Sequence, residues 1–116
     1  MNNEQLEALK TADEYLYNLK DGVKKVSQYI DEGREQEGIN LIPLVADGLK
    51  WLIDAVQATT DVQKEKIETE NMNEFLGEIV EALENEDYIL VGDLFNYEIH
   101  PILEEIHEKI RQIIAA

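Results

Sequence analysis

The sequence predicts a single all-α domain over residues 1–116, folded as an antiparallel up-down-up-down four-helix bundle. Three observations predict this fold class. Four segments carry apolar residues at alternating three- and four-residue steps, which is the spacing of one helix face. No segment alternates β-branched and polar residues between turn signals, as a half-buried strand would. The 116 residues match the size of one hydrophobic core, roughly 100–150 residues.

The first predicted helix has the most regular apolar pattern in the chain. Its a/d repeat predicts one narrow seam against a partner helix. Asn2 or Asn3 can cap its start, and Gly33 is expected to end it. The seam consists of Leu9, Ala12, Leu16, Leu19, Val23, Val26 and Ile30.

The second predicted helix spans about residues 36–59 and should bend near Pro43, because proline lacks an amide donor and crowds the preceding turn. An alternative start lies near Asn40, which could serve as the N-cap. Trp51 lies beside its core stripe. That stripe consists of Ile42, Val45, Leu49, Leu52, Ile53 and Val56.

The third predicted helix follows a polar, partly helical connection over residues 61–71. It should span about residues 72–85, with Asn71 or Asn73 as its N-cap. Its inward residues are expected to be Phe75, Leu76, Ile79, Val80 and Leu83.

The fourth predicted helix spans about residues 88–114, with Asp87 as its N-cap. The apolar period stays in phase on both sides of Pro101, so we expect a long helix kinked near Pro101 and not a break. Its inward stripe consists of Val91, Phe95, Ile99, Ile102, Ile106, Ile110 and Ile113, widened by Ile89, Leu90, Leu94 and Leu103.

The charge of the chain restricts its partners. Ten Lys and Arg against 26 Asp and Glu give a formal net charge of −16. Residues 67–108 contain no Lys or Arg but 13 of the 26 acids. Nucleic-acid binders neutralise phosphates with clustered Lys and Arg, so no nucleic-acid partner is expected. A field of this sign attracts a basic partner.

The chain contains no cysteine, which excludes disulfides and thiol nucleophiles. The first ten residues lack the pattern of a signal peptide, and no apolar run reaches the roughly 18–20 residues of a membrane span. A cytoplasmic location without a membrane partner is therefore expected.

The histidines give half of a known metal motif. Ferritin-like sites need two Glu-x-x-His pairs, and Glu104 with His107 forms one. The other histidine, His100, has Tyr97 three residues before it. His100 and Glu104 could together hold a surface cation, although a solvated helix face is the favoured interpretation. No nucleophile, phosphate-loop or calcium-loop motif occurs. We expect no catalytic residue, no cofactor and no metal.

Four glutamates share one face of the third predicted helix. That face is predicted to be either a solvated surface or a docking strip for a basic partner. The four are Glu74, Glu78, Glu81 and Glu84.

Asp93 and Glu98 lie in the most apolar stretch of the chain, so we expect structural polar anchors there. One of these two side chains should be partly buried and hydrogen-bonded to Tyr88, Tyr97 or a carbonyl near Pro101. Core or bundle-end packing is expected for the aromatic residues Trp51, Phe75, Tyr88, Phe95 and Tyr97, and Tyr17 is the expected exposed aromatic.

Three stretches carry a resemblance to a known family. They are ALENEDYILVGDL at residues 82–94, YEIHPIL at residues 97–103 and GLKWLI at residues 48–53. The chain resembles a small uncharacterised helical domain that recurs in Gram-positive bacteria. The resemblance implies a bacterial cytoplasmic bundle and brings no activity and no site residues. A looser likeness in size, acidity and fold class links the chain to small helical export chaperones.

These observations favour a non-enzymatic protein-interaction module, in the manner of a chaperone-like adaptor. It would bind a basic or amphipathic helix of a partner. The alternative is a self-associating structural bundle, in which the isoleucine-rich fourth helix or the first seam forms a homodimer. A metal-dependent enzyme using Glu98, His100, Glu104 and His107 is the third hypothesis.

Overall fold

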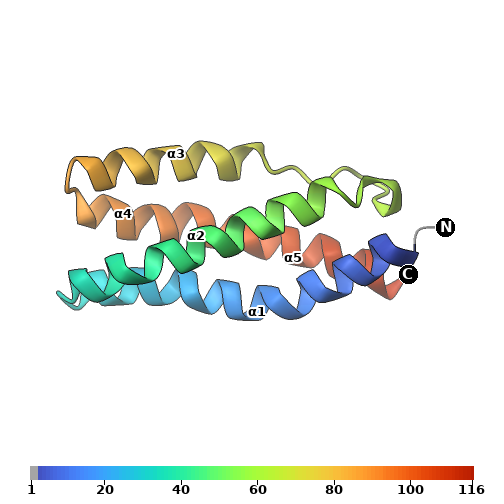
Figure 1. Ribbon diagram of the computed structural model, residues 1–116, viewed down its shortest axis with the longest axis horizontal. Coiled ribbons are helices and arrows are strands. Elements are labelled where there is room, and N and C mark those ends of the chain that lie inside the picture. The colour runs from blue at the N-terminus through green and yellow to red at the C-terminus, as the bar shows by residue number, and fades with distance from the viewer. Residues whose placement is uncertain (1–2) are drawn as a thin grey trace.

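The computed structural model describes residues 3–116, and these residues are helical or in connections, without a strand. The fold is an elongated bundle with extents of 48 × 22 × 19 Å. The α1–α2 and α3–α4 turns lie at one end, and the α2–α3 connection lies at the other (Figure 1). The elements are α1 (Asn3–Asp31), α2 (Glu35–Gln57), η1 (Thr60–Val62), α3 (Glu70–Glu84), α4 (Tyr88–Leu94), η2 (Phe95–Ile99) and α5 (His100–Ala115).

Helix α1 is the centre of the bundle. It contacts α2, α4, η2 and α5, whereas α3 packs mainly against α4 and η2. All seven residues of the predicted first seam are buried, and so are all six of the predicted second stripe. Burial of these two stripes removes a large apolar area from water, which is the main stabilising term of the fold. The helical periodicity therefore predicted the core of this half correctly.

The end of α1 is set by Gly33, as predicted. Its φ of 80° is a left-handed conformation that suits glycine. The amide of Gly33 donates to Ile30 O (3.1 Å) and that of Arg34 to Tyr29 O (2.7 Å), which is a Schellman turn. At the other end, Asn3 is already helical, and Asn2 lies outside the described residues.

Helix α2 begins at Glu35, close to the predicted start, so the alternative start at Asn40 is wrong. Pro43 lies inside this helix and is exposed. Proline leaves the carbonyl of Ile39 without its helical donor. The bend at Pro43 stays a prediction.

The connection between α2 and α3 is tied down by one side chain. Gln63 donates to Val56 O (2.8 Å) and accepts from the amide of Ile67 (2.9 Å), so it satisfies a carbonyl at the end of α2 and fixes the loop. Ile67 is buried. The N-cap position of α3 is Thr69, which makes no side-chain cap bond. The predicted caps Asn71 and Asn73 are wrong, because buried Ile67 and Thr69 fix the chain before them.

The fourth predicted helix is helical throughout, as α4, η2 and α5. Asp87 caps it by accepting from the amide of Leu90 (3.2 Å), as predicted. The η2 segment is a π-helical turn that directly precedes the first turn of α5, where Pro101 lies. A wider turn moves the carbonyl of Tyr97 away from the proline ring, which would otherwise crowd it. The kink at Pro101 stays a prediction.

Five residues expected to face the core, or to pack at a bundle end, lie on the surface. Trp51 on α2 is 39% exposed, so its expected core or bundle-end packing is wrong. The other four lie on α3, α4 and η2. Val80 is 54% exposed, Ile89 74%, Leu90 42% and Tyr97 67%. Helix α3 packs mainly against α4 and η2. One narrow stripe of each helix is enough to fill this interface, so the remaining apolar residues of α3 and α4 are exposed to solvent. The predicted inward positions at Val80, Ile89, Leu90 and Tyr97 are therefore wrong.

Candidate functional site

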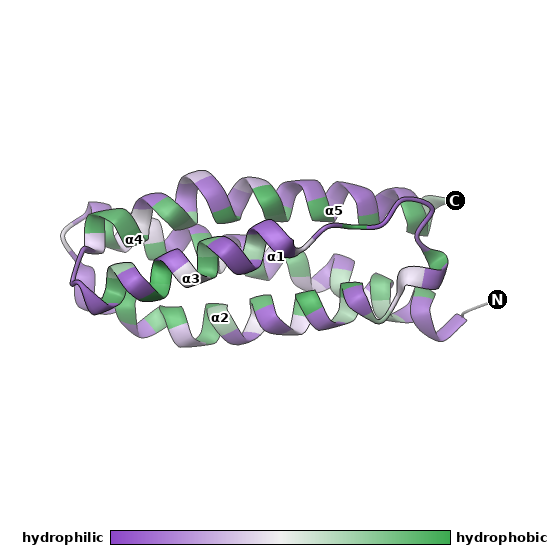
Figure 2. Cartoon of the chain, turned by 90° about the horizontal axis from the view of Figure 1, so that it is seen from above, coloured by the Kyte–Doolittle hydropathy of each residue, from purple (hydrophilic) through white to green (hydrophobic). Residues whose placement is uncertain are grey.

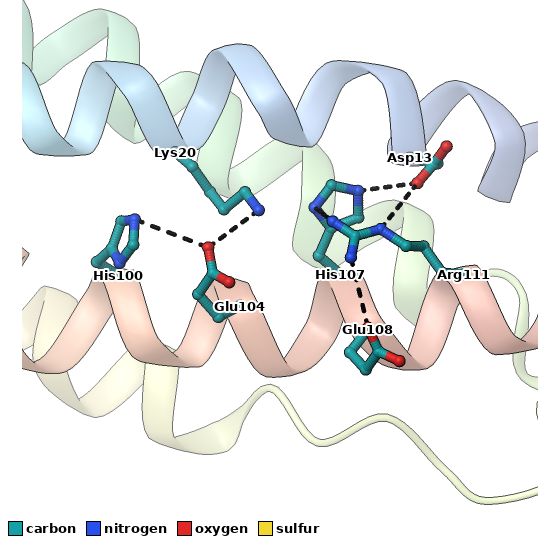
Figure 3. A network of polar contacts seen from close by, with 7 residues as sticks. All are labelled: Asp13, Lys20, His100, Glu104, His107, Glu108 and Arg111. Carbon is teal, nitrogen blue, oxygen red and sulfur yellow. Dashed lines mark hydrogen bonds and ion pairs between the residues drawn. The ribbon is translucent and has the colours of Figure 1, made fainter.

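A row of polar side chains joins α1 to α5, and we call it the α1–α5 seam (Figure 3). Its members recur at three- and four-residue steps on each helix, so they face one another across the interface. From α1 come Asp13, Tyr17 and Lys20, and from α5 come His100, Glu104, His107 and Arg111.

His107 is the buried centre of this seam and is 0% exposed. Its Nε2 lies 2.8 Å from Asp13 Oδ1, and its Nδ1 lies 3.1 Å from Nη2 of Arg111. A guanidinium can only donate, so Nδ1 must accept. These contacts assign a neutral ring that carries its proton on Nε2 and donates it to Asp13.

Burial is the main factor that opposes protonation of both histidines. Burial lowers the pKa of His107, and Lys20 and Arg111 lower it further, against the hydrogen bond to Asp13, which raises it. Burial and Lys24 likewise lower the pKa of His100. Both rings therefore favour the neutral form in the folded protein.

The flanking contacts complete the seam. Lys20 lies 3.0 Å from Glu104 and lowers its pKa through a hydrogen bond. Tyr17, 57% exposed as predicted, covers His107 edge to face with the ring centroids 4.7 Å apart. Arg111 also donates to Glu108 (3.4 Å). Its buried Nε makes no hydrogen bond to any of residues 3–116, because Asp13 Oδ1 is 3.9 Å away.

This geometry links two helices and engages both ring nitrogens of His107. Both ring nitrogens of His107 are occupied, so neither can accept a proton or bind a metal without breaking the seam. Glu104 faces Lys20 and His107 faces Asp13, so the Glu104–His107 pair does not converge (Figure 3). Residues 3–116 contain no group of three His, Cys, Asp or Glu able to hold a metal ion.

Of the two residues expected on a solvated helix face, Glu104 is exposed and His100 is half-buried. The burial of His107 was not predicted. The sequence did contain a signal for its burial. His107 stands in phase with Leu103, Ile106 and Ile110, all of them buried, so its position belongs to the core stripe of α5. Its partner Asp13 directly follows the seam residue Ala12.

The four predicted partner-binding residues lie on the surface of α3. Glu74, Glu78, Glu81 and Glu84 are all exposed, and none forms an ion pair with another described residue. The exposed apolar residues Val80, Ile89 and Leu90 occur on the same two-helix unit. Figure 2 shows α3 as mixed hydrophilic and hydrophobic and the start of α4 as hydrophobic. We call these seven residues the α3–α4 surface.

The predicted polar anchors do not anchor the bundle in the described part of the chain. Asp93 and Tyr97 are exposed and Glu98 is half-buried. Neither carboxylate forms a hydrogen bond with Tyr88, Tyr97 or a carbonyl near Pro101 among residues 3–116. The π turn widens the backbone at this point, which relieves the crowding at Pro101 without a side-chain acceptor or donor.

A surface pocket of about 340 Å³ lies at the opposite end of the bundle, between the connection before α3 and the end of α5. Val62, Lys64, Lys109 and Ile113 line it together with Glu65. Its charges are of both signs, and the negative end of the α5 dipole lies beside it. These features do not define one class of ligand.

The fold and the seam define an all-helical domain in which a row of polar side chains, centred on buried His107, links the first and last helices. The chain belongs to the family described as a domain of unknown function (DUF8042), whose family model matches residues 7–109. No curated protein and no solved structure matches the chain. No helix in residues 3–116 has the length and apolar character needed to cross a bilayer.

Proposed function

We propose that this domain is a non-enzymatic protein-interaction module that binds a basic amphipathic helix of a partner polypeptide, in the manner of a chaperone-like adaptor. The proposed docking site is the α3–α4 surface. The proposal includes an up-down-up-down bundle with a kink near Pro101, a bacterial cytoplasmic setting, and neither nucleic acid nor membrane as a partner.

One observation carries this proposal. Exposed apolar residues and unpaired carboxylates occur together on α3 and α4, where Ile89 is 74% and Val80 54% exposed. Residues 67–108 contain no Lys or Arg that could neutralise the carboxylates. A basic amphipathic helix offers both complements, apolar side chains for Val80 and Ile89 and ammonium groups for the glutamates.

The packing of α3 adds support. This helix buries only Met72, Ile79 and Ala82 fully and packs mainly against α4 and η2. An element with few buried contacts can shift at low cost when a partner helix arrives. Against an enzyme stands His107, whose two nitrogens are both engaged.

Binding of a model peptide tests the proposal. The probe is a fluorescent amphipathic helix of alternating Leu and Lys blocks, compared with a peptide of the same composition in scrambled order. Fluorescence anisotropy should show binding of the amphipathic peptide that weakens as NaCl is raised. Equal binding of the scrambled peptide would contradict the proposal, because it would show that the net charge of the peptide alone explains the binding.

Matched variants locate the site. Glu78→Gln with Glu81→Gln removes two charges from the α3–α4 surface, and Glu4→Gln with Glu14→Gln removes two exposed charges from α1. The first pair should weaken peptide binding several-fold more than the second, because only the first pair faces the peptide. Equal effects of the two pairs would place the binding site elsewhere.

A further inference from the structure

A second apolar surface lies on the opposite helix pair, outside the core. Two surface hollows there share Tyr15. Thr11, Tyr15 and Trp51 line one of them, and Leu41, Leu44 and Gly22 help to line the other. Leu44 is 68% and Trp51 39% exposed. None of the residues that line the two hollows is charged, and we call this surface the α1–α2 groove.

The groove is held in a fixed shape. The rings of Tyr15 and Trp51 meet edge to face, with centroids 5.4 Å apart and planes at 81°. Tyr15 can lie against α2 because residue 48 is glycine. A Cβ at this position would clash with the tyrosine hydroxyl. Rigid aromatic side chains with apolar surface in solvent are typical of interface anchors.

The charges beside the groove suit a second copy of the same chain. Residues 1–57 carry 11 acids and 6 Lys or Arg, whereas residues 58–116 carry 15 acids and 4. Three exposed ion pairs lie next to groove residues along α1 and α2. They are Lys10–Glu7, Lys25–Asp21 and Lys50–Asp54. Because each of these pairs is neutral, this rim repels a second copy less than the α3–α4 surface does, where every charged residue is acidic.

The groove also has a protrusion and a hollow at matching positions. Leu44 and Trp51 are seven residues apart on α2, so they stand roughly 10.5 Å apart along its axis. A two-fold axis midway between them, near Gly48, would place Leu44 of each copy in the Thr11–Tyr15–Trp51 hollow of the other. We propose that two copies of this chain associate through their α1–α2 grooves in this isologous arrangement.

This interface differs from the two surfaces that the sequence suggested for self-association. The first seam and the buried face of α5 belong to the core of the monomer, so they are unavailable to a second copy. The α1–α2 groove instead leaves the core intact. It also leaves the α3–α4 surface free, so the dimer and the binding of a partner helix can be tested separately.

Sedimentation velocity over a concentration series tests the dimer, with emission of Trp51 as a second signal. Trp51 is the only tryptophan of the chain, so its emission should shift to the blue as the groove becomes buried. Leu44→Glu should weaken dimerisation roughly tenfold or more and remove the shift, because each interface would bury an unpaired carboxylate.

Ile89→Glu is the matched control, because it makes the same kind of change at an exposed residue of the α3–α4 surface. It should leave dimerisation unchanged while weakening peptide binding. Circular dichroism checks that both variants keep the helical fold. A wild-type chain that stays monomeric at high micromolar concentration would overturn the inference. A dimer that survives Leu44→Glu would overturn it as well, because its interface would lie elsewhere.

Discussion

At the scale of single residues, His107 is the side chain whose surroundings most constrain its chemistry. It is fully buried, donates to Asp13 and accepts from Arg111. A second proton on this ring would point at the Arg111 guanidinium and break that contact. The folded state therefore depends on a neutral imidazole.

Acidification should for this reason destabilise the protein. The pKa of His107 is lowered in the folded state, whereas an unfolded chain titrates near 6.5. The unfolded state takes up the proton first, so the stability present above about pH 6.5 is lost as the pH falls toward the lowered pKa. Urea unfolding between pH 7.5 and 5.5, followed by circular dichroism, measures this loss.

His107→Gln is the informative variant, since its amide can both donate to Asp13 and accept from Arg111 but does not titrate in this range. Its unfolding free energy should depend less on pH than that of the wild type. His100→Gln serves as a comparison, because the pKa of His100 is also lowered. An unchanged slope in the His107→Gln variant would mean that the charge state of this ring does not govern stability.

The sequence contained a signal for part of this site, although the site itself was not predicted. The phase of the α5 stripe indicates that position 107 faces inward, but nothing local indicates that Asp13, 94 residues away in the chain, is its partner. Long-range pairing depends on which helices meet and in what register, and the helical period does not specify either. The exposed acids of α3 were predictable from their spacing, because one face had already been assigned to the core.

At the scale of elements, the two tight turns of the bundle offer a direct comparison. Both have the Schellman hydrogen bonds, with Arg34 N to Tyr29 O (2.7 Å) in one and Asp87 N to Ala82 O (2.8 Å) in the other. The left-handed position is Gly33 in the first turn and Glu86, with a φ of 55°, in the second. A side chain in this conformation costs about 1 kcal/mol or more.

Glu86→Gly should therefore raise the free energy of unfolding by roughly 0.5–1 kcal/mol, because glycine adopts this conformation without steric strain. Gly33→Ala, the opposite change at the equivalent position, should lower it by about 1 kcal/mol. Urea unfolding of the two variants beside the wild type measures both effects. A Glu86→Gly protein less stable than the wild type would show that this side chain contributes more than its backbone strain costs.

Element types and most boundaries were predictable, whereas the π turn was not predicted. A usable signal lies in the run Val91, Phe95, Ile99 and Leu103, four residues apart and all buried. Each four-residue step drifts about 40° around an ideal helix, so such a run leaves the core unless a wider turn absorbs the drift. The exposure of Ile89 could not be predicted in this way, because it depends on how little of α4 the helix α3 covers.

At the scale of the whole molecule, a net charge of −16 on 116 residues destabilises the compact folded state through repulsion between like charges. Six of the ten basic side chains have an acidic partner in residues 3–116, yet most carboxylates have none. Their mutual repulsion extends over roughly 10 Å at 0.1 M salt and farther at lower salt. The acidic half, residues 58–116, experiences most of it.

Added salt should accordingly stabilise the fold. Raising NaCl from about 10 mM to 150 mM should increase Tm by a few degrees, because screening reduces repulsion more in the compact state than in the expanded one. Thermal unfolding followed by circular dichroism measures this shift. KCl at equal ionic strength is the control and should act equally. A Tm that falls with salt would mean that the surface ion pairs outweigh the repulsion.

The first turn of α1 and the last turn of α5 lie at the same end of the bundle, away from the α3–α4 turn (Figure 1). An affinity tag or neighbouring domain joined to either terminus would consequently sit at one pole of a 48 Å long molecule. The opposite pole, where α4 starts beside Ile89, would project into solution. A chain immobilised on a bead through either terminus would therefore keep that pole accessible to an incoming polypeptide.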